Sequence, residues 1–469
     1  METWKKVWKE VQRQLLLAGP VSLVTLMQIS LLMISLMFIG HNDGKLALAG
    51  ASMATAFAAV TGYYVLVGST NALDTLCSQL FGAKHYPILG IELQRAIIFS
   101  SATSVMISII WANATPILIA MHQDHEISHE AGRYLLYLVP SNFAFGLLQC
   151  FRSFLQNQNI VNPIVLSSVV ATIVHILCCW IMVCKYEWGS SGAAVATSIS
   201  YCVNAFCLAL FIKFSSTCKE TWNGFSKQAL HNFLPYMKLA LPSVLMECFK
   251  TWAFEILIIF SGFFPNPVLE TSVQSICLNT FGLIWSIPAG LMVSASVRVG
   301  NEIGAKNLEA ARLAMVVVSV IVIIEGLVVG ISIILLRKMW AELYSNDKNV
   351  VKIVSSLMPF LAMSCFLNGF QTVLSGIFKG CGWQNKGVYL NLAAFYFVGI
   401  PCQVTFAFVL HMKSKGLWLG MIIGFVVNVI FFLMIILRAN WDKEVMKAEN
   451  RVKECSTYGE KSSGQNNSS

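Results

Sequence analysis

Long apolar stretches constrain this chain more than any other feature, because each is long enough to cross a lipid bilayer. Ala96–Met121, Val161–Cys184 and Met315–Leu336 are the clearest of them. A helix of about 20 apolar residues spans the hydrocarbon core. The strands of a membrane barrel alternate over about 10 residues instead, and this alternation is not seen. Charged residues make up 12% of the chain, against roughly 25% in soluble domains. We therefore expect an all-α integral membrane protein.

The hydropathy pattern predicts twelve transmembrane helices. They fall at residues 15–40, 48–73, 96–121, 131–155, 161–184, 192–213, 239–263, 271–297, 313–336, 352–378, 387–410 and 416–437. This predicts a division into an N-terminal segment, a first six-helix lobe, a linker, a second six-helix lobe and a polar tail, which we expect to be disordered. Their residue ranges are 1–14, 15–213, 214–238, 239–437 and 438–469.

The distribution of positive charge predicts the orientation of the chain. Most of the 32 Lys and Arg lie in the N-terminus, the even-numbered loops and the tail. Positive residues are enriched in cytoplasmic loops, so we expect a multi-pass protein with both termini in the cytosol. The first apolar stretch is too long for a signal-peptide core and is predicted to be retained. The net charge of +9 is explained by loops beside anionic lipid, with no nucleic-acid partner.

The two halves of the sequence resemble each other at a nearly constant offset. Three pairs of residues match 222 positions apart and two more match 224 apart: Pro20 with Pro242, Gly82 with Gly304, Gln149 with Gln371, Gly192 with Gly416, and Asn204 with Asn428. Each half holds six predicted spans, so the repeat is parallel and its pseudo-two-fold axis runs along the membrane normal. Transporters built in this way bind substrate near the midplane between the repeats.

Several short motifs make the chain resemble the multidrug and toxic compound extrusion (MATE) family, in particular its plant detoxification-type branch. They extend from the first span to the start of the tail: Phe38–His41, Leu48–Ser52, Ala72–Gln79, Phe81–Lys84, Leu155–Asn159, Pro265–Ser272, Arg298–Ala305, Gly380–Gln384 and Asn440–Trp441. The resemblance implies two lobes arranged in a V and proton-driven antiport of organic compounds out of the cytosol. Alkaloids, flavonoids and xenobiotics are the implied substrates, and the vacuolar or plasma membrane is the implied location.

The alternatives are an exporter of organic acids or hormones with the same fold, a lipid flippase of related architecture, and a channel. No nucleotide-binding P-loop, HExxH or GxSxG motif is present, so neither an enzyme nor an ATP-driven pump is expected. The 14 cysteines include no CxxC pair, which argues against a metal site. We expect a monomer that uses no cofactor and takes its energy from a proton gradient.

The seventh span holds three ionisable residues, each of which is costly within a membrane. Glu247 and Lys250 are three residues apart and share a helix face, so we expect a structural ion pair. Glu255 lies eight residues beyond Glu247, about 12 Å further along the helix axis. It is on a different face of the helix from Lys250. Burial favours the protonated form of a carboxylate, and Glu255 is therefore the predicted proton-coupling residue. The alternative is a role in helix packing.

The resemblance also shows one departure from the family. Many relatives have Cys-Leu-Glu where this chain has Cys248-Phe249-Lys250, so a lysine replaces a family glutamate. Glu247 is a second candidate for proton coupling because its charge can compensate for this change. The first span contains no acidic residue at all, which shifts the predicted coupling to the second lobe.

Other polar residues in the spans are candidates for weaker reasons. Asp74 is a third proton-coupling candidate, although its place near the end of a span favours a role in helix capping. His175 can titrate near neutral pH, but an interhelical hydrogen bond is the more common role. Pro242 removes a helix hydrogen bond and is the predicted hinge. The predicted substrate-binding residues are the amides within spans, some of which must simply bridge helices: Gln149, Gln371, Asn142, Asn279, Asn368 and Asn391.

Overall fold

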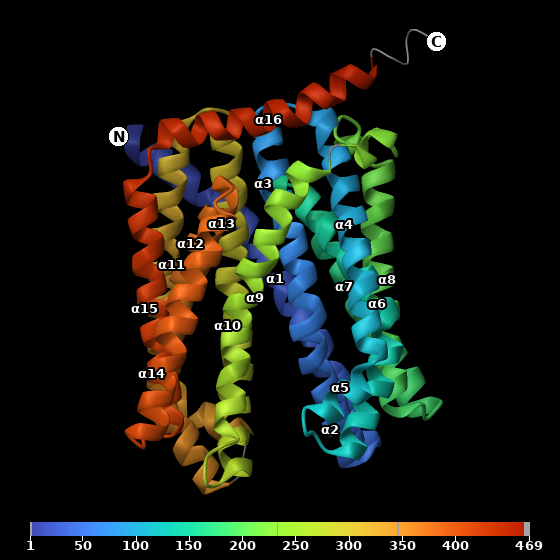
Figure 1. Ribbon diagram of the computed structural model, residues 1–469, viewed down its shortest axis with the longest axis vertical. Coiled ribbons are helices and arrows are strands. Elements are labelled where there is room, and N and C mark those ends of the chain that lie inside the picture. The colour runs from blue at the N-terminus through green and yellow to red at the C-terminus, as the bar shows by residue number, and fades with distance from the viewer. Residues whose placement is uncertain (1, 232, 345–346, 464–469) are drawn as a thin grey trace. The chain divides into compact units, whose positions relative to one another are not determined.

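The computed structural model describes residues 2–231, 233–344 and 347–463, which are helical almost throughout and contain no strand. Figure 1 labels the helices in chain order. Those of the first half are α1 (Glu2–Asn42), α2 (Gly44–Ala58), α3 (Tyr64–Gly82), α4 (Tyr86–Ala112), α5 (Ala114–Ala120), α6 (His125–Asn157), α7 (Asn162–Cys179) and α8 (Gly189–Phe214). Those of the second half are α9 (Leu234–Ser261), α10 (Pro267–Gly304), α11 (Leu308–Tyr344), α12 (Lys348–Cys381), α13 (Gln384–Asn391), α14 (Ile400–Val404), α15 (Ser414–Arg438) and α16 (Trp441–Ser463).

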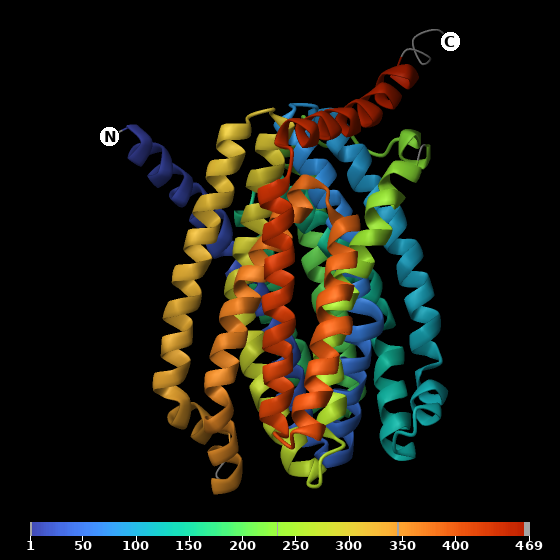
Figure 2. The ribbon, with the colours of Figure 1, turned by 60° about the vertical axis from the view of Figure 1, so that its left-hand side comes forward.

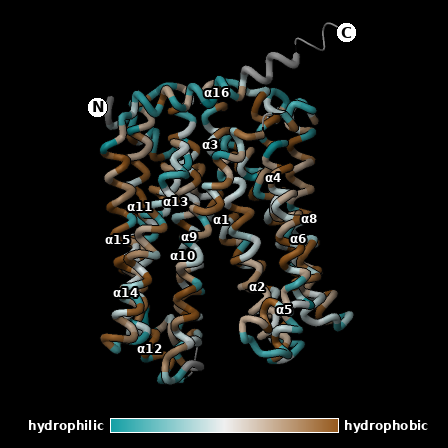
Figure 3. Tube along the Cα trace, viewed as in Figure 1, coloured by the Kyte–Doolittle hydropathy of each residue, from teal (hydrophilic) through white to brown (hydrophobic). Residues whose placement is uncertain are grey.

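Short π-helical turns join some of these helices into longer membrane crossings. A turn at Ala59–Tyr63 connects α2 to α3, and a turn at Trp180–Lys185 extends α7. Two more, at Leu392–Gly399 and Thr405–Val409, lie before and after α14. In the described part of the chain, eleven helices or joined helices are long and apolar enough to cross a membrane. Figure 3 shows their hydrophobic middles.

The seventh predicted span corresponds to α9, which is long enough to cross a membrane but is not among these eleven, because its charged residues leave no sufficiently long apolar stretch. Glu247, Lys250 and Glu255 all lie in its central part. Together with the eleven apolar crossings, α9 makes the predicted set of twelve. The chain is therefore an all-α membrane protein, as its hydropathy predicts.

The third predicted span, 96–121, has the wrong boundaries. Helix α4 begins at Tyr86, ten residues earlier, and ends at Ala112 before the separate short helix α5. The charges before Ala96 made this stretch look like a loop, but the structure satisfies them inside the helix. Arg95 forms an ion pair with Glu92 one turn away, and its other terminal nitrogen donates to the carbonyl oxygen of His231 at 3.0 Å.

The chain forms two compact units whose boundaries differ from those of the predicted lobes. The first unit contains residues 1–22 and 249–447, and the second contains residues 23–248 and 448–469. The boundary between residues 22 and 23 falls inside α1, and the boundary between residues 248 and 249 falls inside α9. The predicted lobes 15–213 and 239–437 broke the chain in loops instead. The predicted N-terminal segment 1–14 is likewise part of α1 from Glu2 onward.

Contacts inside each unit explain why α1 and α9 are each divided between the two units. The start of α1 belongs to the first unit, and the start of α9 belongs to the second. In the first unit, the side-chain amide of Gln14 on α1 donates to the carbonyl oxygen of Ala314 on α11 at 2.9 Å. In the second unit, the hydroxyl of Tyr236 on α9 donates to the carbonyl oxygen of Ser69 on α3 at 3.0 Å. A helix that crosses a whole membrane can pack its two ends against different neighbours, which a count of spans does not reveal.

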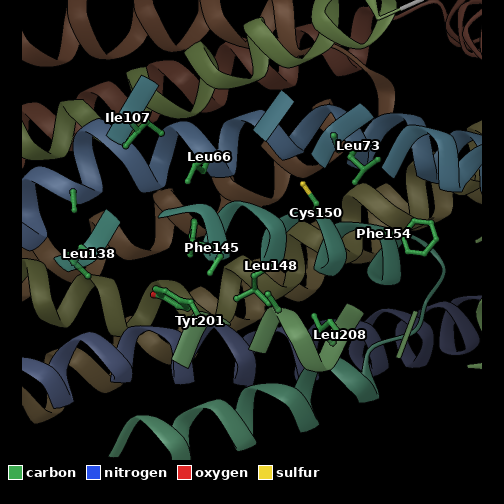
Figure 4. Packing of buried hydrophobic residues seen from close by; sticks show 14 of the residues in the cluster. Leu66, Leu73, Ile107, Leu138, Phe145, Leu148, Cys150, Phe154, Tyr201 and Leu208 are labelled. Atoms are coloured by element: carbon green, nitrogen blue, oxygen red, sulfur yellow. The ribbon is translucent and has the colours of Figure 1, made fainter. Parts of the chain in front are cut away.

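The second unit has a continuous apolar core between α3, α4, α6 and α8. Figure 4 shows Leu66, Phe145, Leu148 and Tyr201 in this core. The ring centroids of Phe145 and Tyr201 are 5.4 Å apart in an edge-to-face arrangement, a geometry that aromatic pairs prefer. This packing holds the helices of the second unit in a fixed arrangement.

The first unit is held by close packing of α10 against α12. A Cβ atom on Gly376 would lie 2.3 Å from the carbonyl oxygen of Met292, and one on Gly380 would lie 2.7 Å from that of Ser296. Only glycine permits backbones to approach this closely, as small residues do between membrane helices. Helix α11 packs along α12 as well, and the two are seen side by side in Figure 2.

The tail contains a helix, so our prediction of a disordered segment 438–469 is wrong for its described part. Helix α16 covers Trp441–Ser463, and residues 464–469 lie outside the described residues. Its buried residues include Trp441, Ala448, Val452 and Cys455, at the spacing of one face of a helix. The tail is polar on average, and this average polarity concealed the apolar face of the helix from a composition-based prediction. The first unit holds the start of α16 through a hydrogen bond of 2.9 Å from the Trp383 indole to Glu444.

The described part of the predicted linker 214–238 contains two short 3₁₀ turns, Ser216–Cys218 and Lys227–Leu230, and its residues from Leu234 onward already belong to α9. The amide of Gln94 on α4 donates to the carbonyl oxygen of Gly224 at 2.9 Å and accepts from the backbone N–H of Ser226 at 2.8 Å. Paired backbone groups of this kind attach the linker firmly to the second unit.

Candidate functional site

The predicted proton-coupling residue Glu255 lies on α9 in the first unit. Its side chain is half-buried. It forms no hydrogen bond and no ion pair with any of the residues that the structure describes. An unpaired carboxylate within a membrane span is costly and is a functional-site candidate by default. A half-buried carboxylate without a described partner is what the predicted proton-coupling role of Glu255 requires.

The unusual lysine of α9 is almost fully buried. Lys250 is 4% exposed, and its ammonium lies 5.9 Å from the centroid of the Trp285 ring on α10. A cation at this distance from an indole face is attracted by the ring. Glu247 is 7% exposed and belongs to the second unit. Its predicted ion pair with Lys250 stays a prediction.

A second intramembrane acid, Glu325, was missed in the sequence. It lies in the middle of the apolar stretch Met315–Leu336, where a single Glu is conspicuous, and that signal was sufficient to find it. In the structure Glu325 is half-buried on α11. It lines a small cavity in the first unit together with other residues of α11 and with residues of α10 and α12: Phe281, Ile284, Trp285, Pro288, Gly326, Val329, Cys365 and Asn368.

Two of the predicted substrate-binding amides lie close together on α12. Asn368 lines the cavity beside Glu325. Gln371 is fully buried, and neither its amide nitrogen nor its amide oxygen has a hydrogen-bond partner among the described residues. Leaving a buried amide unpaired costs about 1–3 kcal/mol. Such a cost in a folded protein suggests that the group serves a function.

The other four amides divide into two groups. Gln149 is half-buried and Asn279 is exposed, and neither is hydrogen-bonded to a described residue. Asn142 instead donates to the carbonyl oxygen of Ser104 on α4 at 2.8 Å. Asn391 accepts from the Asn428 amide at 2.9 Å. Asn142 and Asn391 thus make contacts of the helix-bridging kind.

The side chains of Asp74 and His175 both form hydrogen bonds with residues of neighbouring helices. The carboxylate of Asp74 accepts hydrogen bonds from Ser153 and Asn157 on α6, which agrees with a packing role. His175 is fully buried on α7, and its Nε2 donates to the Leu31 carbonyl oxygen at 3.0 Å. Its Nδ1 lies 3.0 Å from Ser200 Oγ. Pro242 lies inside α9, as the proposed hinge requires.

A buried arginine in the second unit was also missed, because its position near a predicted span end suggested a loop. Arg152 on α6 is 6% exposed. Its guanidinium donates to the side-chain oxygen of Gln28 at 2.6 Å and to Ser168 Oγ at 3.4 Å. None of the described carboxylates lies within ion-pair distance of it. Among the described residues, Arg152 is thus a buried cation whose hydrogen-bond partners are neutral groups.

No group of three or more His, Cys, Asp or Glu side chains able to hold a metal ion occurs among the described residues. All 14 cysteines are free thiols.

Twelve long helices, an internal repeat, and carboxylates and amides within the spans define a polytopic membrane transporter. The family model of MatE, the multidrug and toxic compound extrusion transporters, matches residues 20–181 and again residues 242–405. The two matches begin 222 positions apart and end 224 apart, which confirms the predicted repeat. The chain belongs to the MATE family, as its motifs indicate, and is a transporter rather than an enzyme.

Curated relatives and solved structures agree with this assignment. The chain is 49% identical to Protein DETOXIFICATION 16 of Arabidopsis thaliana over 96% of its own length and 93% of that protein. It is 46% identical to Protein DETOXIFICATION 15 of the same plant, over 97% and 93%. The crystal structure of the eukaryotic MATE transporter AtDTX14 matches with a TM-score of 0.92 and 36% identity, over 95% of this chain and all of that one. The plant detoxification-type branch is therefore confirmed.

Proposed function

We propose that this protein is a proton-coupled antiporter that exports organic compounds from the cytosol by alternating access. The observation that carries the proposal is Glu255, a half-buried carboxylate within a span that has no hydrogen-bond or ion-pair partner among the described residues. A carboxylate in such a place changes its protonation state at a modest change of environment. Protonation from the acidic side then lowers the affinity for substrate, and deprotonation restores it on the cytosolic side.

Gln371 in the first unit and Gln149 in the second, neither of which has a hydrogen-bond partner among the described residues, are each proposed as a contact for organic substrates of the alkaloid, flavonoid and xenobiotic kinds. These two residues occupy equivalent positions in the repeat. Gln371 is fully buried, and a buried amide without a described partner can donate to and accept from a polar substrate group at little further desolvation cost. Aromatic residues and 19 methionines supply surfaces that adapt to flat molecules of varied shape.

A second candidate function is export of organic acids, and two buried cations favour it. Lys250 is 4% exposed and Arg152 is 6% exposed, and Lys250 replaces a family glutamate. A buried cation attracts a carboxylate substrate and repels a cationic one. Transport of citrate in preference to a cationic alkaloid would support this second candidate.

The test uses the purified full-length protein in proteoliposomes with an acidic interior. Uptake of berberine, a flat cationic alkaloid, and of citrate is measured with and without a protonophore. We expect uptake of one of them to stop when the protonophore is added. Glu255→Gln should abolish gradient-driven uptake, while Glu309→Gln, which alters an exposed Glu in the first turn of α11, should not.

Three results would contradict the proposal. Normal gradient-driven uptake by Glu255→Gln would remove the coupling role of Glu255. Uptake insensitive to the protonophore, with movement of labelled lipid between leaflets, would indicate a flippase. Single-channel currents would indicate a channel.

We further propose that the protein acts as a monomer in the vacuolar or plasma membrane with both termini in the cytosol. The excess of Lys and Arg in the terminal segments and even-numbered loops supports this orientation. A tag placed after residue 469 should be cut by protease added to right-side-out vacuoles, where the cytosolic face is outside. Protection of the tag until detergent is added would contradict the orientation.

A further inference from the structure

We propose that Glu325 binds a transported proton in a small cavity between α10, α11 and α12, as a second coupling site separate from Glu255. The inference rests on the proposed proton-coupled antiport. The cavity is built entirely within the first unit, and its lining comes from three consecutive helices.

The size of the cavity excludes an organic substrate. Its volume is about 10 Å³, close to the room that one water molecule needs. Sites for drug-sized ligands are about 300–1,000 Å³. A proton carried by a carboxylate, with one water beside it, fits a space of this size.

The surroundings of Glu325 favour its neutral form. From α10 the cavity is lined by Phe281, Ile284, Trp285 and Pro288, none of which carries a charge. From α12 the titratable group is the thiol of Cys365, and Asn368 is neutral. On α9, the ammonium of Lys250 lies 5.9 Å from the centroid of the Trp285 ring. Glu325 itself forms no hydrogen bond or ion pair with a described residue.

An ionised carboxylate in an apolar cavity has lost most of its hydration without gaining a partner, which disfavours the charge. Protonation of Glu325 removes this cost. Deprotonation becomes favourable when a second water or a nearby positive group enters its surroundings. The carboxylate can therefore alternate between the two forms as the surroundings open and close.

The cavity adjoins the amides proposed to bind substrate. Asn368 lines it, and Gln371 is three residues further along α12, on the same helix face. A charge that appears on Glu325 changes the electrostatic potential at both amides. Substrate and proton would then affect each other's affinity reciprocally.

Gly369 offers a test that leaves the carboxylate in place. A Cβ atom at this position would lie 3.7 Å from Glu325 Oε2, 3.6 Å from Val322 Cγ2 and 3.6 Å from Pro288 Cβ. These are ordinary contact distances, so Gly369→Ala should fold. Its methyl group would exclude water from the carboxylate and favour the neutral form. Gly330→Ala is the matched control on α11, because its Cβ would meet only the Ala362 carbonyl oxygen, at 3.9 Å.

The direct experiment is infrared difference spectroscopy of the reconstituted full-length protein during pH titration, without substrate. We expect the wild type to show a carbonyl-stretch band of a protonated carboxylic acid, part of which disappears in Glu325→Gln and remains in Glu309→Gln. Gly369→Ala should move the midpoint of this part upward by about half a pH unit, and Gly330→Ala should leave it in place.

Uptake of berberine and citrate into the same vesicles provides the second measurement. We expect gradient-driven uptake of the transported compound to be about tenfold lower in Glu325→Gln than in the wild type. Uptake by the wild type that does not depend on the pH gradient would contradict the proposed antiport itself, independently of the infrared result. A gradient-driven wild type whose Glu325→Gln variant keeps both the band and the uptake would overturn only the assignment of Glu325. Dependence of the band on sodium instead of pH would also overturn it.

Discussion

Glu10 and Arg298 are 288 positions apart in the sequence and form a two-pronged ion pair inside the first unit. The Arg298 guanidinium donates to Glu10 through Nε at 3.0 Å and through Nη2 at 2.8 Å. Nη2 also donates to Glu302 on the same helix at 2.8 Å, and the Gln14 amide donates to Glu10 at 3.0 Å. The family motif around Arg298 therefore attaches the first turns of α1 to α10.

We expect this ion pair to show strong coupling in a double-mutant cycle. Removing one partner of a buried pair leaves the other charge uncompensated and costs about 3–5 kcal/mol. Glu10→Gln or Arg298→Gln alone should therefore lower the thermal midpoint in detergent markedly, and the double variant should lose less than the sum. Additive losses would contradict the coupling. Arg13→Gln serves as a comparison that should cost much less, since its side chain is half exposed and lies 4.0 Å from Glu10.

Gln371→Leu should stabilise the protein and reduce its transport. The substitution removes an amide that has no described hydrogen-bond partner and keeps a similar volume, so we expect a gain of about 1–3 kcal/mol. Uptake should fall because the amide is the proposed substrate contact. Both quantities are measured on one preparation, by thermal unfolding and by vesicle uptake.

Asn428→Leu is the matched control for Gln371→Leu, because the Asn428 amide donates to Asn391 at 2.9 Å. This variant should lose stability where Gln371→Leu gains it. A loss of stability in Gln371→Leu of the same size as in the control would show that its amide is bonded.

His175→Phe should lower stability without changing the pH dependence of transport. The histidine donates to the Leu31 carbonyl oxygen and is hydrogen-bonded to Ser200 Oγ, and the loss of these two buried hydrogen bonds costs about 0.5–1.5 kcal/mol each. Ile173→Phe, on an exposed part of the same helix, is the control. A shifted pH profile of uptake in the His175 variant would instead indicate that His175 takes part in proton coupling.

The hydrogen bonds that hold Trp441–Lys447, the start of α16, inside the first unit should weaken in acid. Burial by itself raises the pKa of Glu444, but hydrogen bonds from Lys447 and Trp383 outweigh it and hold the pKa below its ordinary value of 4.5. A lowered pKa contributes stability that is present above pH 4.5 and is lost as the pH falls through the folded-state value. Hydrogen exchange of the α16 amides should therefore be slow at pH 7 and faster, after correction for intrinsic rates, below pH 4.

Glu444→Gln should remove this pH dependence, because glutamine does not titrate. Glu449→Gln, further along α16 and paired there with Lys453, should retain it. Equal pH dependence in all three proteins would show that another group governs the attachment of α16.

Twelve spans, their repeat and the family were predictable because they depend on local hydropathy and on short motifs. The site was predictable only in part. Glu255 could be named because a charge inside an apolar run is visible in the sequence. Glu325 was visible in the same way and was overlooked. No sequence pattern could show that Asn142 bonds to Ser104 while Gln371 has no hydrogen-bond partner among the described residues, since that depends on which helices are neighbours.

The amino-acid sequence by itself determined that this chain crosses a membrane twelve times in two related halves, because each span must satisfy its own backbone in lipid. Tertiary structure alone decided which ends of α1 and α9 join which unit, that Arg298 finds Glu10, and that Glu325 and Asn368 line one cavity. These outcomes depend on packing between different helices, some of them hundreds of residues apart. The energies of such contacts are set by shape and burial, which are properties of the folded chain.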